Sequence, residues 1–313
     1  MLKTKTISQQ SSGKKMKVKI WRNRGLYVFL IPMVCYFIIF SVLPIYGLQI
    51  AFRDFKPPLG ITGSPWVGLK YIKKFINSYS FLSLIKNTLT LSLYSLVICQ
   101  PLALVLAVVL KYCPLKRMGK LAQTASFAPH FISVVVLVGM MKTFFMPGSG
   151  IVNVVLGKLG IEAIDFMGDP KLFPHMYAWS RVWAHTGYHA IVYVAALAGV
   201  SEDLHEAAIM DGASLLQRIR HIDLPTIMPM MVILLIMNVG NMLQIGSEKV
   251  LLMQAASNLS ASEIISTYTY KIGLLSTQYS YSAAIGLFNN LVDIILLVAV
   301  NKIAQKLTET SLW

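Results

Sequence analysis

Long apolar runs with few or no charged residues alternate along this chain with shorter polar segments. Each run approaches or exceeds the ~20 residues that an α-helix needs to cross the hydrocarbon core of a membrane. The pattern predicts an all-α membrane protein with six transmembrane helices, the third of them kinked at Pro129. The six runs occupy residues 25–52, 87–110, 121–141, 176–200, 226–246 and 282–300.

The composition agrees with a membrane protein. Hydrophobic residues make up 56% of the chain and charged residues 13%, whereas a soluble domain carries roughly 25% charged residues. No linker rich in proline, glycine and serine divides the chain, so we expect one helical bundle. Its expected parts are a basic tail (1–24), a first transmembrane helix with an external loop (25–86), a core of five transmembrane helices that includes the polar loop 201–225 (87–305), and a C-terminal tail (306–313).

Clusters of lysine and arginine beside the apolar runs predict the orientation of the chain. The net charge is +15, and basic residues gather without acidic ones in segments 1–24 and 111–120. Because short basic segments stay in the cytoplasm, we expect both of them, the loop 201–225 and both termini there. The loop 53–86 is also basic, and we give the shorter segments more weight. The basic residues form no stripe interleaved with aromatic residues, so no nucleic-acid partner is expected.

Sequence motifs of catalysis, metal binding and nucleotide binding are absent. Cys35, Cys99 and Cys113 lie in or beside apolar segments and lack metal-ligand spacing, which is typical of buried thiols. His185 and His189 stand four residues apart without the Glu of H-E-x-x-H, so no metal site is predicted. Neither a G-x-x-x-x-G-K-[ST] phosphate loop nor a G-x-S-x-G nucleophile motif occurs. We therefore expect a chain that binds no cofactor and is not an enzyme by itself.

The polar segment 206–225, EAAIMDGASLLQRIRHIDLP, interrupts the apolar runs and predicts two short helices. Small residues near its start allow close approach by another protein, and its central glycine can turn the chain with a positive φ. A structured loop of this kind between two membrane helices indicates a surface that another protein contacts. The residues assigned to that contact are Glu206, Ala207, Ala208, Asp211, Gly212, Leu224 and Pro225.

Polar side chains inside the last three runs predict a lined pathway, because polar groups in a membrane helix usually face a bundle interior or water. Hydroxyl, amide and charged groups suit a sugar, whose hydroxyls both donate and accept hydrogen bonds. Two alternatives stay open: these groups bond neighbouring helices together, or a cationic side chain reaches the outer interface. Asp293 neutralising Arg181 is a further option. The candidates are Arg181, His185, Tyr188 and His189 in the fourth run, Asn238, Asn241 and Gln244 in the fifth, and Asn289, Asn290 and Asp293 in the sixth.

The segment 206–225 resembles the EAA loop of ABC-importer permeases. The shared pattern is Glu-Ala-Ala, three residues, Gly212, nine residues and Ile-x-Leu-Pro, in the loop that lies two runs before the C-terminus. Segments 193–200 (YVAALAGV) and 279–288 (YSYSAAIGLF) and the terminal Ser-Leu-Trp resemble the polysaccharide group of these permeases. The chain departs from the group in 245–249 (IGSEK), where relatives have an aromatic residue before the glutamate.

The resemblance implies a type I ABC-importer permease bundle with cytoplasmic EAA coupling helices, in a bacterial inner membrane. It implies import of an oligo- or polysaccharide driven by two ATP-binding cassette subunits, which hold ATP and Mg²⁺. It also implies a second permease subunit of different sequence and an external solute-binding protein. The alternatives are a permease for another solute such as a peptide, an ion-coupled secondary transporter, and a membrane enzyme. The secondary transporter would need internal repeats and ion-coupling carboxylates, and the enzyme would need a catalytic set that the sequence lacks.

Overall fold

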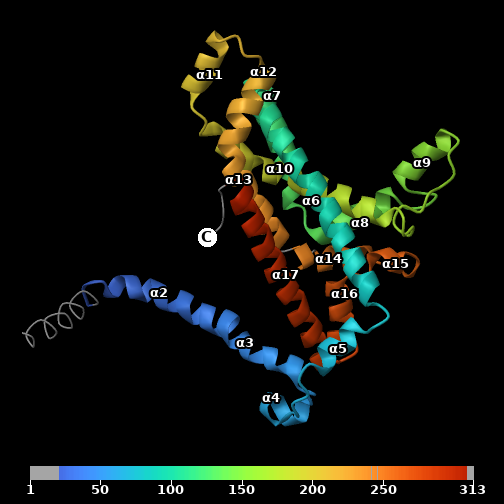
Figure 1. The fold of residues 1–313 in the computed structure, drawn as a ribbon. Helices are drawn as coiled ribbons and strands as arrows, with labels where there is room; N and C mark the ends of the chain where they lie inside the picture. Colours follow the sequence, from blue (N-terminus) through green and yellow to red (C-terminus); the bar gives the residue numbers. More distant parts are fainter. Residues whose placement is uncertain (1–20, 241, 245, 309–313) are drawn as a thin grey trace, which may run out of the picture. The chain divides into compact units, whose positions relative to one another are not determined.

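The computed structural model of the chain describes residues 21–240, 242–244 and 246–308, without the side chains of Gln244, Leu307 and Thr308 (Figure 1). The described residues are mostly helical, and the β-pairing among them is one isolated bridge between Arg53 and Trp66. Most of the expected basic tail and most of the C-terminal tail lie outside the described residues. The chain divides into two compact units, Met1–Leu69 and Lys70–Trp313.

The first unit contains the first expected transmembrane helix. Its helical segments follow one another without a break and form a candidate membrane span over Arg24–Phe52, as predicted. After the span, the Arg53 guanidinium donates to the carbonyl oxygens of Thr62 and Ser64, and the Phe52 and Trp66 rings stack. The elements are α2 (Arg24–Phe37), the π-helix η1 (Ile38–Val42), α3 (Leu43–Gly47), η2 (Leu48–Phe52), η3 (Pro57–Leu59) and α4 (Gly60–Gly63).

The second unit is a bundle of long helices. Helix α6 packs along α10 more extensively than any other pair, and α13 packs on α17. Fully buried alanines (Ala103, Ala107 and Ala190) let α6 and α10 approach closely around Tyr193. The long elements are α6 (Phe81–Lys111), α7 (Lys116–Phe127), η4 (Ala128–Phe131), α8 (Val134–Phe144), α10 (Phe173–Ala198), α13 (Leu224–Gly240) and α17 (Tyr279–Thr308).

The third expected transmembrane helix is strongly bent. Residues Lys116–Phe131 and Val134–Phe144 meet at 100°, with Pro129 in the last turn before the break. The predicted kink is therefore confirmed. Ser133 begins α8 as its N-cap, its hydroxyl accepting from the backbone N–H of Val136 at 3.3 Å.

Four described helices are long and apolar enough to cross a membrane, and the bent pair raises the number to five. Helix α10 is also long enough, with 26 residues, but it is less apolar because it carries the polar residues singled out above. One contact fixes α10 against the bend. A Cβ at Gly187 would lie 2.0 Å from the carbonyl oxygen of Ser126, so only glycine allows this approach.

The fifth helix differs from the predicted run 226–246. Helix α13 follows directly on α12 (Leu215–Arg218) and the π-helix η5 (Ile219–Asp223), so that one continuous helix runs over Leu215–Gly240. It ends at Gly240, and the 3₁₀ turn η6 (Met242–Gln244) follows. The start of α13 agrees with the predicted run to within two residues, whereas the helix ends at Gly240, before the predicted end at Gly246.

The early end of α13 has a physical cause in the neighbouring helices. Asp293 accepts the backbone N–H of Leu243 at 3.1 Å, and Asn289 donates to the Leu243 carbonyl oxygen at 3.5 Å. Ser92 donates to the carbonyl oxygen of Met242 at 2.5 Å. Non-helical backbone inside a bundle is stable when side chains satisfy its polar groups in this way.

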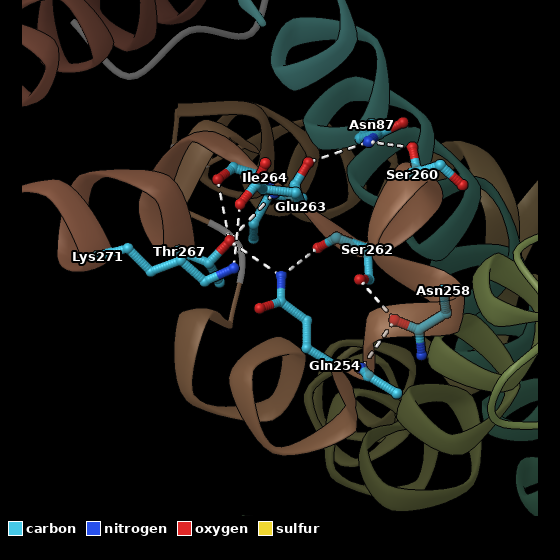
Figure 2. Close-up of polar contacts among 10 residues, drawn as sticks. Asn87, Gln254, Asn258, Ser260, Ser262, Glu263, Ile264, Thr267 and Lys271 are labelled. Carbon is cyan, nitrogen blue, oxygen red and sulfur yellow. Dashed lines mark hydrogen bonds and ion pairs between the residues drawn. The ribbon is translucent and has the colours of Figure 1, made fainter. Parts of the chain in front are cut away.

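The segment between α13 and α17 is folded into short helices and tied to α6. Gln254 donates to the Ser262 carbonyl oxygen at 2.9 Å, and Asn87 donates to the carbonyl oxygens of Ser260 and Glu263 (Figure 2). The Glu263 carboxylate also pairs with Lys271 at 3.0 Å. This segment comprises α14 (Ser247–Met253), η7 (Ala256–Asn258), α15 (Leu259–Ser262), α16 (Ile265–Tyr270) and η8 (Lys271–Leu275), and the other short helices of the unit are α5 (Lys70–Ile76), α9 (Ile151–Lys158) and α11 (Glu202–Met210).

Candidate transport cavity and coupling segment

A polar cavity lies where α6, α10 and α13 meet. The space inside it is about 590 Å³ when the solvent at its open side is counted, and about 60 Å³ of that can hold the centre of a water molecule. Apolar side chains of α6, α13 and η6 complete its wall. Three residues predicted to line a pathway, Arg181, His189 and Asn238, line this one cavity. The polar residues of its lining are Ser92, Ser95, Cys99, Gln100, Arg181, His189, Tyr193 and Asn238.

Two basic side chains near the cavity, Arg181 and Lys249, have no carboxylate partner among the described residues. Lys249, on α14, is 7% exposed, and its ammonium donates to the carbonyl oxygen of Tyr177 at 3.0 Å and lies 4.6 Å from the centre of the Tyr177 ring. Burial, and then the charge of Arg181, lower the pKa of Lys249 to about 7. We call Arg181 and Lys249 the uncompensated cations.

The other two candidates on α10 face the bend rather than the cavity. His185 Nδ1 lies 3.1 Å from His130 Nδ1, and the Tyr188 ring stacks on the His130 ring with centroids 4.1 Å apart. The polar residues of α10 therefore face two different parts of the bundle. Arg181 and His189 meet the cavity, whereas His185 and Tyr188 meet η4.

The candidate pathway residues of the fifth and sixth helices also lie in different surroundings. Asn238 lines the cavity while its amide donates to the Leu234 carbonyl oxygen at 2.8 Å. Asn241 and the side chain of Gln244 lie outside the described part of the chain. On α17, Asn289 and Asp293 are buried and bond the backbone of η6. Asn290 is exposed on another face.

The sequence reasoning missed the contribution of α6 to the cavity. Ser92, Ser95 and Gln100 line it, and the Gln100 amide donates to the Tyr193 hydroxyl at 3.2 Å. A signal existed, since these polar residues interrupt the charge-free run 87–110.

The segment that resembles the EAA loop forms an exposed helix, a turn and a second helix. Gly212 makes the turn with φ +78°, which favours glycine. Ser214 then begins α12 with a capping box completed by Gln217. In Figure 1, α11 and α12 lie at one end of the long helices of their unit, and α5 and α16 lie at the other. We call residues 202–218 the coupling segment after the EAA loop that they resemble, and their coupling role stays a prediction.

The residues predicted to contact another protein, in the coupling segment and at the start of α13, are mostly accessible. Ala208 and Leu224 are half-buried, and Pro225 lies in the continuous helix Leu215–Gly240, directly after the π-helix η5. Exposed apolar side chains accompany them, Met210 at 87% and Leu216 at 74%. Contiguous exposed apolar surface is typical of protein-interaction sites, and the contact of these residues with another protein stays a prediction. The exposed predicted residues are Glu206, Ala207, Asp211, Gly212 and Pro225.

Comparisons with known proteins identify the family. No family model matches the chain. Protein LplB of Bacillus subtilis is 39% identical over 292 residues, covering 93% of this chain and 92% of the relative. The polygalacturonan/rhamnogalacturonan transport system permease protein YteP of the same organism is 36% identical over 307 residues, covering 98% of this chain and 96% of the relative.

A solved structure agrees with these relatives. A chain of the bacterial alginate ABC transporter, in complex with an alginate pentasaccharide-bound periplasmic protein, superposes with a TM-score of 0.87 and 33% identity, covering 94% of this chain and 98% of that one. The family predicted from the EAA pattern is thereby confirmed. The chain belongs to the permease components of oligosaccharide and polysaccharide ABC importers.

Proposed function

We propose that this chain lines the translocation pathway of an importer for acidic oligo- or polysaccharides, and that the cavity between α6, α10 and α13 is part of that pathway. The observation that carries the proposal is the uncompensated positive charge at the cavity. A buried cation is costly unless an anion neutralises it. A guanidinium binds a carboxylate through two parallel hydrogen bonds.

The remaining lining groups fit the rest of a sugar ring. Serine hydroxyls and the amides of Gln100 and Asn238 can donate to and accept from saccharide hydroxyls. Two related importers support the acidic substrate. YteP is named for polygalacturonan and rhamnogalacturonan, and the structural neighbour imports the acidic polysaccharide alginate.

The topology we propose has six transmembrane helices, with α10 as the fourth and the bent pair as the third. The coupling segment and the basic turn 111–120 then lie in the cytoplasm with both termini, in a bacterial inner membrane. Two ATP-binding cassette subunits holding ATP and Mg²⁺ contact the coupling segment, since the sequence carries no phosphate loop of its own. A second, different permease and an external solute-binding protein complete the complex.

Uptake of defined sugars by the reconstituted importer tests this function. We expect ATP-dependent uptake of oligogalacturonate or alginate oligosaccharides and little uptake of a neutral glucose oligosaccharide of equal length. Arg181→Gln should lower acidic uptake about 10- to 100-fold, the value of one charge-assisted hydrogen bond. Lys158→Gln, at an exposed position of α9, is the matched control and should leave uptake unchanged.

Three results would refute parts of the proposal. Equal uptake of neutral and acidic sugars would reject the acidic substrate. Unchanged uptake with Arg181→Gln, in a complex that still assembles, would reject the cavity as the pathway. Uptake that continues without the ATPase subunits would favour an ion-coupled transporter.

A further inference from the structure

Asp223 is a buried carboxylate that the functions discussed so far leave without a role. Its side chain is 0% exposed, two side chains donate hydrogen bonds to it, and an imidazole nitrogen lies close to it. The Lys111 ammonium donates to Oδ1 at 2.6 Å, the Tyr112 hydroxyl donates to Oδ2 at 2.5 Å, and His205 Nε2 lies 3.2 Å from Oδ1. Lys111 also donates to the carbonyl oxygen of Leu197 at 3.2 Å. We call these five residues the Asp223 knot.

The knot joins four segments that are distant in sequence. Lys111 and Tyr112 end α6, Leu197 belongs to the last turn of α10, His205 lies on α11, and Asp223 ends the π-helix η5 that leads into α13. One carboxylate therefore connects the coupling segment with the ends of α6, α10 and α13. These three helices are the ones that form the cavity walls.

The chemistry of the knot favours a stiff connection. Hydrogen bonds to a charged group are shorter and stronger than neutral ones. Burial and the adjacent Asp223 raise the pKa of the Tyr112 phenol, so the phenol keeps its proton and remains a donor. Separation of the segments would leave the buried carboxylate without its ion partner. A state of this kind is strongly disfavoured.

Without the knot, the covalent path from the coupling segment leads directly into two helices. Helix α12 continues through η5 into α13, and residues 199–201 link the end of α10 to α11. Helix α6, which supplies Ser92, Ser95 and Gln100 to the cavity, has no such covalent link. Lys111 and Tyr112 supply that connection through Asp223.

We propose that Asp223 is a positioning residue that makes α6 move with α10 and α13 when a partner displaces the coupling segment. The proposal rests on the proposed function in one respect, that an ATPase subunit contacts the coupling segment. A carboxylate with a merely structural role would affect the stability and yield of the complex. A positioning residue affects how the cavity responds to ATP in complexes that are already assembled.

The test reports on α6 in the complete reconstituted importer. The three cysteines are replaced by serine and a single cysteine is placed at Leu96, which lies on α6 in the cavity wall. The labelling rate of that cysteine by a water-soluble maleimide is measured with and without ATP. We expect the ratio of the two rates to be several-fold in this background and to approach one with Asp223→Asn, while ATP hydrolysis by the co-purified subunits continues.

Matched variants keep the outcome interpretable. Lys111→Met should reproduce the loss of the ATP response, and Lys116→Met, at an exposed position five residues further, should not. Tyr112→Phe removes a single hydrogen bond and should reduce the response partially, which carries the test if Asp223→Asn fails to assemble. The exchange of charges in Lys111→Asp with Asp223→Lys should restore part of the response.

Two results have distinct meanings. An ATP response that stays at the background value in Asp223→Asn or, where that variant fails to assemble, in Tyr112→Phe overturns the positioning role. Absence of co-purified ATPase subunits with the unsubstituted coupling segment overturns the proposed function instead.

Discussion

The Asp223 knot and the uncompensated cations are two charged sites in the same bundle, and their surroundings are opposite. Asp223 is fully buried and has an ammonium, a phenol and an imidazole within 3.2 Å. Arg181 and Lys249 take part in no ion pair among the residues that the structure describes. A charge that is fully paired by its own chain holds segments together, whereas one that lacks a partner is available to a ligand.

The largest effect is expected at the knot. Lys111→Met leaves Asp223 buried without its ion partner and should destabilise the protein by about 3 kcal/mol, the lower end for a broken buried pair because Lys111 is 22% exposed. Thermal melting of the purified complex measures this change. Lys116→Met is the control, and equal melting temperatures of the two variants would show that the knot contributes nothing to stability.

Lys249→Met should raise the stability of the folded protein by an amount that depends on pH. The pKa of Lys249 is lowered from 10.5 to about 7, first by burial and then by Arg181. Between these values the unfolded protein binds a proton that the folded protein does not, so the folded state loses stability as pH falls through this window. Below about pH 7 both states are protonated on Lys249 and the loss stays constant.

The melting temperature of Lys249→Met should therefore exceed that of the parent by a margin that grows as pH falls through this window. Below about pH 7 the difference in melting temperature should stay constant. A margin that is independent of pH would mean that Lys249 is neutralised by a partner in the folded protein.

Tyr112→Phe should have a smaller effect than Lys111→Met. It removes one hydrogen bond to Asp223 and leaves the ion pair in place, which costs about 1 to 2 kcal/mol. A comparison of both single variants with the double variant measures their coupling, and we expect less than additive loss because both side chains bond the same carboxylate. Strict additivity would contradict a shared knot.

Much of the fold could be predicted from local sequence. The charge-free runs predicted the apolar helices, and Pro129 predicted the 100° bend, because both features act within a single segment. The EAA pattern predicted the family, since it combines several residues at fixed spacing. The pathway residues of the last three runs remain predictions, and the structure brings Arg181, His189 and Asn238 to one cavity.

Other features depend on contacts between distant segments. The early end of α13 follows from Ser92, Asn289 and Asp293, which bond the backbone of η6 from other helices. Asp223 gave no signal in the sequence because Lys111 and Tyr112, its partners, are separated from it by 112 and 111 positions. Pairing of this kind is visible only in the folded chain.

Arg181→Gln has the smallest expected effect on stability. It most directly tests the difference between the Asp223 knot and the uncompensated cations. Arg181→Gln and Lys111→Met are melted side by side in the assembled complex, in the absence of any sugar. Lys111→Met should lower the melting temperature by several degrees, whereas Arg181→Gln should leave it unchanged or raise it, because Arg181 takes part in none of the ion pairs among the described residues. A fall in the melting temperature of Arg181→Gln as large as that of Lys111→Met would contradict it, since Arg181 would then be held by the protein and not kept for a ligand.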